Sequence, residues 1–347
     1  MKCRLSDCLE FSRYSLLFTE AYVITRLLIN DVGKILITGG AGFIGTAFAR
    51  YAHACGLDIV ILDNLSSRRR SNFEELIELG INCVEGDVRD PLLVSKVLED
   101  CHSVVHLAAK VSVHESIRNP KETMDVNVNG TQILLDECMK QNIRCFILAS
   151  SAAVYGDSQS LPLREDDAGM VLSPYAESKL INEEQISQLR SLNCQIFALR
   201  FFNVYGNGQD SKSDYGAVIP TFIKQMSGGN SPILYGDGMQ TRDFVHVHDV
   251  CRAIATCLNY NDSEGNKFVF NVATQESTSL LELIGLINRI LSESLDIFPV
   301  KPNFSETRKG DIVHSLGSIE LIKSTLGWEP ELHIYEGLSE MIRQGRD

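Results

Sequence analysis

The sequence predicts an α/β fold, in which a Rossmann-like, doubly wound parallel sheet carries a smaller, mixed α/β lobe formed mainly by the C-terminal part. Three observations predict it. Short apolar segments alternate with helical patterns from residue 34 to about residue 203, a glycine-rich loop follows the first apolar segment, and the alternation ends where glycine and proline become frequent. Alternating strands and helices are typical of βαβ units, whose right-handed crossovers place helices on both faces of the sheet.

Six apolar, β-rich segments are the expected strands of the first part: KILIT, DIVILD, INCVEGD, SVVHLAA, IRCFILASS and CQIFALRFFN. Apolar periodicity between them predicts a helix that ends near Cys55 and further helices over 72–79, 119–141 and 173–191. Further along, RDFVHVHDVCRAIATCL and KFVFNVA predict a strand, a helix and a strand that return to the sheet.

The charge and the cysteine content exclude several classes of partner. The 347 residues carry a formal net charge of -13 at pH 7, so we expect neither nucleic acid nor a membrane surface as a partner. The ten cysteines are scattered, form no C-x-x-C pair and lack zinc-ligand spacing. We therefore expect reduced thiols, a cytoplasmic protein and no metal site.

The segment ITGGAGFIG places Gly39, Gly42 and Gly45 directly after the first expected strand. Such glycines permit a tight turn, the approach of backbone to a pyrophosphate and close helix–strand packing, and the helix N-terminus attracts the anion. Asp63 ends the second expected strand, where a carboxylate binds the adenosine ribose and repels a 2′-phosphate. The expected cofactor is therefore NAD. The arginines at 68–70 are an alternative 2′-phosphate site, although a solvated loop explains them as well.

These signals divide the chain into three parts. Residues 32–205, with 241–273 returning to the same sheet, form the expected NAD-binding Rossmann domain. Residues 206–240 and 274–347 form the expected substrate-binding lobe. Residues 1–31 are an extension whose apolar runs are interrupted by charged residues, and they fall short of the about 18 uninterrupted apolar residues of a membrane span. The extension is either a peripheral helix or the product of a misassigned start codon.

The order of short motifs resembles the extended short-chain dehydrogenase/reductase family, in particular its nucleotide-sugar epimerases. The motifs that carry the resemblance are TGGAGFIG, LDN, GDVRD, HLAA, NVNGT, SSAAVYG, YAESK, RFFNVYG, GDGMQTRDFVHVHDV, RKGD and LGWEP. They extend from residue 33 to about residue 338 and leave out only the extension. The resemblance implies an NAD-dependent nucleotide-sugar 4-epimerase. It also implies a homodimer whose interface is formed by the helices expected over 119–141 and 173–191.

The resemblance assigns residues to the cofactor. Asp87 and Val88 are expected to hold the adenine, and residues 107–109 to line the pyrophosphate and nicotinamide. Asn127 is expected to contact the cofactor or to orient nearby backbone, unless it is an ordinary packing amide. The complete expected cofactor set is Gly39, Gly42, Phe43, Ile44, Gly45, Asp63, Asn64, Asp87, Val88, Leu107, Ala108, Ala109, Asn127, Tyr175, Lys179 and Phe202.

The motif YAESK places Tyr175 and Lys179 four residues apart on one face of an expected helix. A free tyrosine has a pKa of about 10, and a nearby ammonium group is expected to lower it so that Tyr175 can act as a base. A surface pair without function would have the same spacing. By the resemblance, Ser151 bridges the sugar oxygen and the Tyr175 oxygen. The expected catalytic residues are therefore Ser151, Tyr175 and Lys179.

Ala152 and Ala153 follow Ser151 at positions where related dehydratases carry an Asp-Glu pair, and where decarboxylases usually carry Glu at the second position. Those acids act on the sugar beyond C4, and two methyl groups cannot. The resemblance therefore implies simple return of the hydride. Tyr175 removes the O4 proton while C4 gives a hydride to NAD, the keto sugar turns over, and the hydride returns to its other face.

The expected substrate ligands are Ser151, Tyr175, Asn203, Arg242, Arg308, Asp311 and Ser315. Arg242 and Arg308 match family positions that grip the diphosphate, for which the planar guanidinium is suited, although surface ion pairs would explain them too. Asp311 is expected to bind ribose hydroxyls, and Asn203 the diphosphate or the sugar. Ser315 is expected to leave room beside C2 for an N-acetyl group, where more restricted family members have tyrosine.

Three functions remain open on the sequence alone. The leading one is a UDP-hexose 4-epimerase for UDP-glucose and UDP-galactose that also accepts the N-acetylated sugars, with cell-surface polysaccharide biosynthesis as its expected setting. The second is a UDP-glucuronate 4-epimerase or another NAD-dependent nucleotide-sugar epimerase or reductase. The third is an NAD-binding protein without turnover, and the complete set of Ser151, Tyr175 and Lys179 argues against it.

Overall fold

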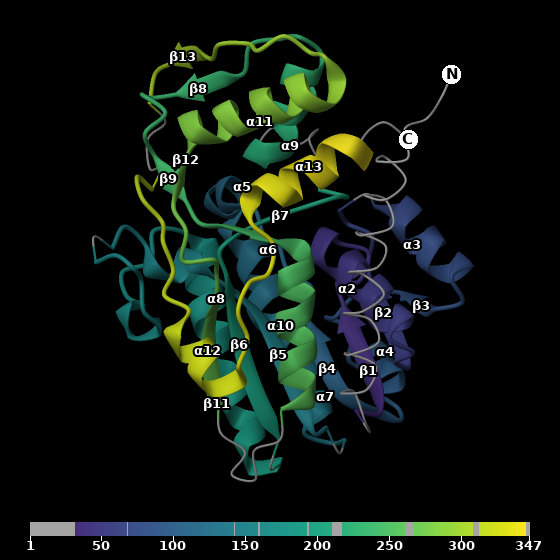
Figure 1. Cartoon of the computed structure of the whole chain (residues 1–347). Coiled ribbons are helices and arrows are strands. Elements are labelled where there is room, and N and C mark those ends of the chain that lie inside the picture. Colours follow the sequence, from purple (N-terminus) through teal and green to yellow (C-terminus); the bar gives the residue numbers. More distant parts are fainter. Residues whose placement is uncertain are drawn as a thin grey trace.

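The structure is a computed structural model, and it describes residues 32–67, 69–141, 143–158, 160–192, 194–209, 217–260, 267–307 and 312–344. Within these residues, a parallel sheet of seven strands has the order β11-β6-β5-β4-β1-β2-β3 (Figure 1). Its strands are β1 (Lys34–Thr38), β2 (Ile59–Asp63), β3 (Asn82–Glu85), β4 (Cys101–His106), β5 (Cys145–Ser151), β6 (Gln195–Phe201) and β11 (Lys267–Val272). The strand order reverses between β1 and β4, and ligands of doubly wound sheets bind beside such a point.

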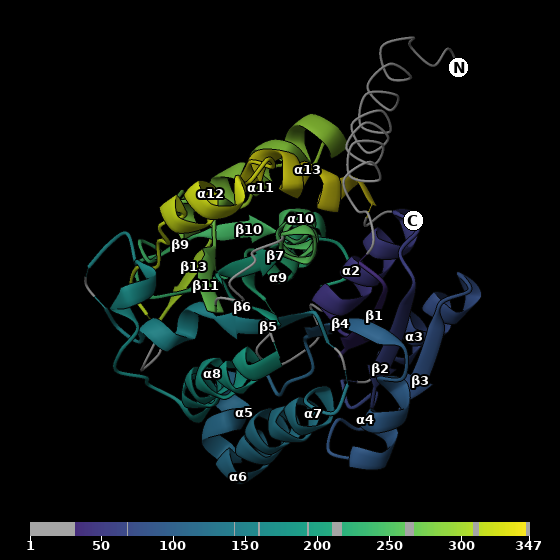
Figure 2. The ribbon, with the colours of Figure 1, turned by 90° about the horizontal axis from the view of Figure 1, so that it is seen from below.

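Helices cover both faces of the sheet (Figure 2). One face is covered by α2 (Phe43–Ala54), α3 (Arg70–Glu78), α10 (Val247–Asn259) and α12 (Glu320–Leu326). The other face is covered by α4 (Pro91–Val97), α5 (Val113–Arg118), α6 (Pro120–Met124), α7 (Gly130–Cys138) and α8 (Pro174–Gln185). Every residue of β2 is buried, as expected for a strand between two helical layers. The predicted doubly wound parallel sheet is therefore confirmed.

The expected helix over 119–141 is interrupted in the structure. Helices α5, α6 and α7 follow one another, and the turn Asp125–Asn129 between α6 and α7 is π-helical. The carbonyl of Asn127 accepts bonds from the side chains of Thr131 and Asn182 at 2.5 and 2.8 Å. These side-chain donors supply bonds at the irregular turn, and such π turns often occur at functional sites.

Two other expected elements end earlier than predicted. Helix α8 stops at Gln185 and continues as a 3₁₀ helix over Ile186–Leu192, whereas a single helix was expected over 173–191. Strand β6 stops at Phe201, and the next residues form β7 (Asn203–Tyr205), which pairs with β10 (Phe244–His246) instead of the sheet. The chain thereby leaves the sheet at its carboxyl end.

A smaller lobe lies beyond the carboxyl ends of the strands, at the top of Figure 1. It contains α9 (Val218–Ser227), α11 (Leu280–Leu295), α13 (Ile334–Gln344) and the strand pair β8 (Ile233–Tyr235) and β13 (Asn303–Ser305). Its helices bury their own apolar cluster, which is separate from the two clusters of the sheet. Two further strands, β9 (Thr241–Arg242) and β12 (Thr278–Ser279), pair antiparallel at its base.

One segment of the expected lobe packs elsewhere. Ile319, Ile322 and Trp328 belong to the same apolar cluster as α2 and α10. The Trp328 indole also donates a hydrogen bond to the Asp249 carbonyl of α10 at 3.2 Å. The segment 319–328 therefore covers the sheet, although the sequence predicted that all of 274–347 belongs to the smaller lobe. The physical reason is that a buried tryptophan needs both a large apolar contact and a partner for its N–H.

None of the helices within the described ranges has the length and apolarity that crossing a bilayer requires. All eight cysteines of these ranges are free thiols, and seven of them are buried. The expected extension, residues 1–31, lies outside the described residues.

Candidate active site

The residues predicted to bind the cofactor and the substrate follow the carboxyl ends of five neighbouring strands. The glycine loop follows β1, Asp63 ends β2, Leu107 follows β4, Ser151 ends β5 and Phe202 follows β6. Because these strands are parallel, their carboxyl ends meet at one edge of the sheet, where the strand order reverses. The structure therefore brings these groups together at the place where a dinucleotide binds such a sheet.

The glycine loop fits a pyrophosphate by its lack of side chains. Gly39 has a φ of +71°, and a Cβ there would lie 2.7 Å from the Ala108 nitrogen. A Cβ at Gly45 would lie 2.2 Å from the Gly39 carbonyl oxygen. Gly42 is the N-cap residue that precedes α2, and no side chain caps the first turn of this helix. The N–H groups of Phe43 and its neighbours are therefore presented to an anion, aided by the helix dipole.

Asp63 also holds the glycine loop. Its two carboxylate oxygens accept hydrogen bonds from the N–H groups of Ala41, at 2.9 Å, and Leu65, at 2.8 Å. Burial raises the pKa of Asp63 above its ordinary value, and the two backbone bonds oppose this shift. The carboxylate can still accept hydroxyl donors through its remaining lone pairs, as a ribose site requires.

The predicted adenine residues form a connected group beside Asp63. The Asn64 amide donates to Asp87 at 2.8 Å, and Arg89 binds both oxygens of Asp87 at 2.9 and 2.8 Å. These bonds, led by the one to Arg89, lower the pKa of Asp87 well below its ordinary range. Val88 is buried between these residues and Gly130.

The arginine run does not form an open phosphate site among the residues described. Arg69 donates to the Gly208 carbonyl at 2.6 Å, and Arg70 binds Glu85 at 2.9 Å. Arg68 lies outside the described residues. These partners favour structural roles for Arg69 and Arg70 over a 2′-phosphate site.

Asn127 orients the backbone of Lys110, which follows the residues 107–109 that are expected to line the nicotinamide. Its side chain accepts from the Lys110 N–H at 2.7 Å and donates to the Lys110 carbonyl at 3.0 Å. It also donates to the Ser178 hydroxyl on α8 at 2.9 Å. Asn127 thus ties the segment 107–110 to the helix that carries the predicted catalytic pair, which agrees with the orienting role considered from the sequence.

A buried hydrogen-bonded chain was missed at the sequence level. The Thr131 hydroxyl donates to the Asn127 carbonyl, so His106 Nε2, 2.8 Å away, must donate to Thr131. His106 Nδ1 then accepts from Thr38 at 2.7 Å, and Thr38 accepts from the Ala108 N–H. This series of hydrogen bonds fixes the backbone at Ala108, within the segment 107–109 that is expected to line the cofactor. A single histidine in an apolar strand gave no signal of this role.

Tyr175 and Lys179 lie on α8, which begins at a Ser173 cap and carries proline in its first turn. Both side chains are buried, so they are not a surface pair. Ser151 hydrogen-bonds the Tyr175 oxygen, and the Lys179 ammonium donates to the Ala149 carbonyl at 2.7 Å. The three predicted catalytic residues therefore meet at the carboxyl end of β5.

The expected effect of Lys179 on Tyr175 differs from what the structure shows. Burial raises the pKa of Tyr175, and the Ser151 hydrogen bond opposes the shift. The Lys179 ammonium lies 6.0 Å from the Tyr175 ring centre and its nearest acceptor is a carbonyl. Burial also lowers the pKa of Lys179 to about 8. Loss of hydration therefore outweighs the attraction between the two groups here.

Apart from Ser151 and Tyr175, the predicted substrate residues that the structure describes lie around β9. Arg242 is in β9, Asn203 begins β7, and Ser315 donates its N–H to the Thr241 carbonyl at 3.2 Å. Buried Asp243 holds the neighbouring segments together, because its carboxylate accepts from Thr274, Gln275 and Gly317. Arg308 and Asp311 lie outside the described residues. Within the described ranges, no cluster of His, Cys, Asp or Glu has metal-binding geometry.

Comparison with known proteins agrees with this geometry. Residues 35–273 match the NAD dependent epimerase/dehydratase family. A Methanocaldococcus jannaschii protein, provisionally named UDP-glucose 4-epimerase, is 36% identical over 311 residues that cover 89% of this chain and 97% of that protein. The Thermotoga maritima UDP-glucose 4-epimerase with UDP-glucose has a TM-score of 0.83 at 30% identity, covering 90% of this chain and 98% of its own. A Methanobrevibacter ruminantium UDP-N-acetylglucosamine 4-epimerase with UDP-N-acetylmuramic acid has a TM-score of 0.83 at 33% identity, with the same coverage. The chain belongs to the NAD dependent epimerase/dehydratase family.

Proposed function

We propose that this protein is an NAD-dependent UDP-hexose 4-epimerase that interconverts UDP-glucose with UDP-galactose and also accepts the N-acetylated UDP-sugars. The observation that carries the proposal is the meeting of Ser151, Tyr175 and Lys179 at the strand end beside a glycine loop that fits a pyrophosphate. Relatives that are named for this reaction, and a structural neighbour named for the N-acetylated sugar, support it.

The chain's own residues hold the cofactor and move one proton. The glycine loop and the first turn of α2 bind the pyrophosphate, Asp63 binds the adenosine ribose, and the segment 107–109 lies along the nicotinamide side. NAD, when bound, accepts a hydride from C4 of the sugar and later returns it. Tyr175 takes the O4 proton as the C4 carbonyl forms, and gives it back when the hydride returns to the opposite face. Ser151 holds O4 against Tyr175 throughout.

Lys179 is assigned the task of favouring the charged form of Tyr175. An ammonium group near a phenolate lowers the tyrosine pKa, and each unit corresponds to about 1.4 kcal/mol. The Lys179 ammonium, which donates to the Ala149 carbonyl, is the group proposed to approach the ribose and Tyr175 when the cofactor is bound. Since Tyr175 is buried, water cannot replace this partner.

Ala152 and Ala153 limit the reaction to the C4 centre. They follow Ser151 in the 3₁₀ helix Ala152–Tyr155 and are half-buried. Neither methyl group can donate or accept a proton, so no group there can protonate a leaving hydroxyl or remove a proton from C5. The keto sugar is left with hydride return as its productive route.

The site assignment is tested by Tyr175→Phe, which removes only a hydroxyl. Purified protein is given UDP-galactose, UDP-N-acetylglucosamine and UDP-glucuronate, and the product configuration is read by NMR. We expect turnover of the first two in the native protein and a loss of at least about 1,000-fold in the variant, with an unchanged circular dichroism spectrum. A native protein that epimerises none of the three would contradict the proposed function.

The bound cofactor gives a second test. Because the reaction consumes no net NAD, we expect NAD(H) to remain bound through purification. The supernatant of denatured protein is assayed for NAD(H) and NADP(H), and stoichiometric NADP would overturn the assignment of Asp63.

We also propose that the enzyme is a cytoplasmic homodimer that supplies sugars for cell-surface polysaccharides, in keeping with its acidic charge and the free thiols of the described residues.

A further inference from the structure

Three side chains of α8, spaced four residues apart, contact the carboxyl end of β5. Tyr175 is bonded to Ser151, Lys179 donates to the Ala149 carbonyl, and Glu183 accepts a short hydrogen bond from the Ser150 hydroxyl. All three are buried. Because residues four apart share a helix face, Glu183 continues the face that carries the two proposed catalytic groups.

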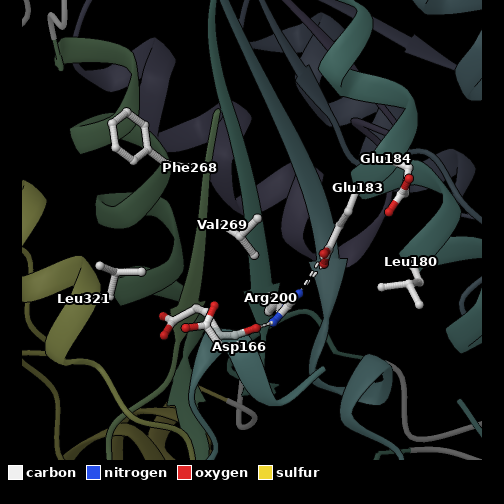
Figure 3. Close-up of a pocket in the computed structure, with 9 residues that line it drawn as sticks. Asp166, Leu180, Glu183, Glu184, Arg200, Phe268, Val269 and Leu321 are labelled. Carbon is white, nitrogen blue, oxygen red and sulfur yellow. Dashed lines mark hydrogen bonds and ion pairs between the residues drawn. The ribbon is translucent and has the colours of Figure 1, made fainter. Parts of the chain in front are cut away.

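Glu183 forms a buried ion pair with Arg200 of β6. The Arg200 guanidinium binds both carboxylate oxygens, at 2.9 and 2.8 Å, and the two side chains are 4% and 5% exposed. Figure 3 shows the pair in the wall of a cavity of about 390 Å³ between α8, α12 and the edge strand β11. Two parallel bonds of this kind fix the direction of both groups.

Arg200 makes two further hydrogen bonds. Its third nitrogen donates to the Tyr155 hydroxyl at 3.0 Å and to the Glu165 carbonyl at 2.6 Å. Tyr155 donates in turn to Asn271 of β11. The network therefore connects α8 with β5, β6 and β11, and it reaches β5 at Ser150, the residue before Ser151.

Stability alone is a weak reason for such a network, because a buried ion pair is often no more stabilising than apolar residues of the same volume. A different effect follows from the position of Glu183. Burial lowers the pKa of Lys179, whereas the charge of Glu183 raises it. Lys179 is also faced by Tyr175 on α8 and by His106 of β4, and burial lowers the pKa of His106 to about 3, so it is uncharged at neutral pH.

We propose that Glu183, held by Arg200 and Ser150, is a positioning residue of the epimerase that keeps Lys179 protonated and fixes α8 against the end of β5. The inference rests on the roles proposed above for Tyr175 and Lys179. A protonated Lys179 favours the phenolate of Tyr175, so Glu183 acts on the reaction through two intermediate groups and contacts neither sugar nor cofactor.

The proposal predicts how the rate depends on pH. A carboxylate near an ammonium group raises the pKa of that group. In a Glu183→Gln variant, which lacks this charge, Lys179 therefore gives up its proton at a lower pH. The alkaline limb of the kcat profile, where Lys179 becomes neutral, must move toward lower pH, while the KM for the sugar stays nearly constant.

The experiment compares Glu183→Gln with Glu184→Gln in the full chain with its bound cofactor. Glu184 is the next residue of α8, lines the same cavity and is exposed. With UDP-galactose, we expect Glu183→Gln to lower kcat at pH 8 about fivefold and to move the alkaline limb down by about one pH unit, with KM within threefold. Glu184→Gln should match the native protein. The Lys179 titration is followed directly by NMR of ¹³C-labelled lysine, assigned with Lys179→Arg.

Glu183→Gln leaves Arg200 buried without its charged partner, and this variant can therefore fail to fold. A milder variant keeps the proposal testable in that case. Ser150→Ala removes the bond between β5 and Glu183 and no charge, and we expect kcat to fall at least about threefold with the alkaline limb in place. A folded Glu183→Gln with native kcat and native limb overturns the proposal. So does native kcat in Ser150→Ala. Tyr175→Phe separates a failure of this proposal from a failure of the proposed function, because full activity in that variant contradicts the assignment of Tyr175 as the base.

Discussion

Loss of hydration governs the behaviour of Tyr175 and Lys179. Burial raises the pKa of the phenol and lowers that of the amine, so burial disfavours the charged form of each group. A neutral tyrosine and a neutral amine cannot remove a proton from a sugar hydroxyl efficiently. A charged pair is different, because each charge offsets the hydration that the other has lost. We therefore propose that the base forms only when both residues are charged together, so that an anion near Lys179 affects the rate through Lys179 and Tyr175.

We propose that a single residue, Ser315, decides which sugars are accepted. Ser315 is buried and its backbone is fixed by Thr241, so a larger side chain there must extend into neighbouring space. We expect Ser315→Tyr to lower kcat/KM for UDP-N-acetylglucosamine about 100-fold and for UDP-glucose less than threefold, because overpacking by a few heavy atoms costs about 1–3 kcal/mol. The two sugars are compared by steady-state kinetics.

The control for this measurement is Ser315→Ala, which removes only a hydroxyl and should leave the ratio of the two kcat/KM values unchanged. An equal loss of kcat/KM for both sugars in Ser315→Tyr would show that the tyrosine disturbs the backbone around residue 315 rather than the space beside C2 of the sugar. A native protein without activity on the N-acetylated sugar would also end this interpretation.

At the scale of elements, the loop between β1 and α2 shows how little room the site leaves. The Gly45 position faces the carbonyl oxygen of Gly39 at a distance no Cβ tolerates. The loop is also tied to β2 through the bond between Asp63 and Ala41. A displacement of the loop would therefore move the adenosine site together with the pyrophosphate site.

We expect Gly45→Ala to lose most of the bound NAD(H) and to lower the free energy of unfolding by about 1–3 kcal/mol, because the added carbon must displace backbone. Cofactor released on denaturation and urea unfolding measure the two effects. The matched control is Gly285→Ala in α11, where an added Cβ meets nothing within 4 Å. That change should keep the cofactor and raise stability by up to about 1 kcal/mol. Normal cofactor content in Gly45→Ala would contradict the close approach.

At the scale of the whole molecule, two buried histidines couple folding to pH. Burial lowers the pKa of His106 to about 3 and that of His246 to about 4, from an ordinary value of 6.5. The unfolded chain therefore binds protons between pH 6.5 and 4 that the folded chain does not. Stability is full above pH 6.5 and is lost as the pH falls.

We expect each of these histidines to remove about 2 kcal/mol of unfolding free energy between pH 7 and pH 5. Urea unfolding at several pH values measures the slope. His246→Gln should make the slope shallower, whereas His53→Gln, at an exposed position of α2, should leave it as in the native chain. An unchanged slope in His246→Gln would mean that this residue is protonated equally in both states.

Assembly is the other property of the whole molecule. We expect a homodimer of about twice 38.6 kDa, joined through the helices of 119–141 and 173–191, because the resemblance to the nucleotide-sugar epimerases implies that these elements pair. Light scattering at micromolar concentration checks the mass. A monomer that is fully active would contradict the expected dimer and would show that association is not needed for catalysis.

The sequence by itself determined the features that depend on short spacing. The glycine loop, Asp63 at the end of the next strand, and Tyr175 four residues before Lys179 are local patterns, because a strand end, a helix start and a helix face are each set by a few neighbouring residues. The alternation of strands and helices in the same way predicted the parallel sheet, since its period is visible without knowledge of the fold.

Only the tertiary structure decided what depends on distant residues. Glu183 and Arg200 are 17 residues apart, and Tyr155 and Asn271 are 116 apart. They meet because β5, β6 and β11 are neighbours in the sheet, and no local pattern encodes that order. The same holds for the pKa of Tyr175. The sequence shows the ammonium group four residues away, but burial, which shifts the pKa in the opposite direction, exists only after the helix has packed against the sheet.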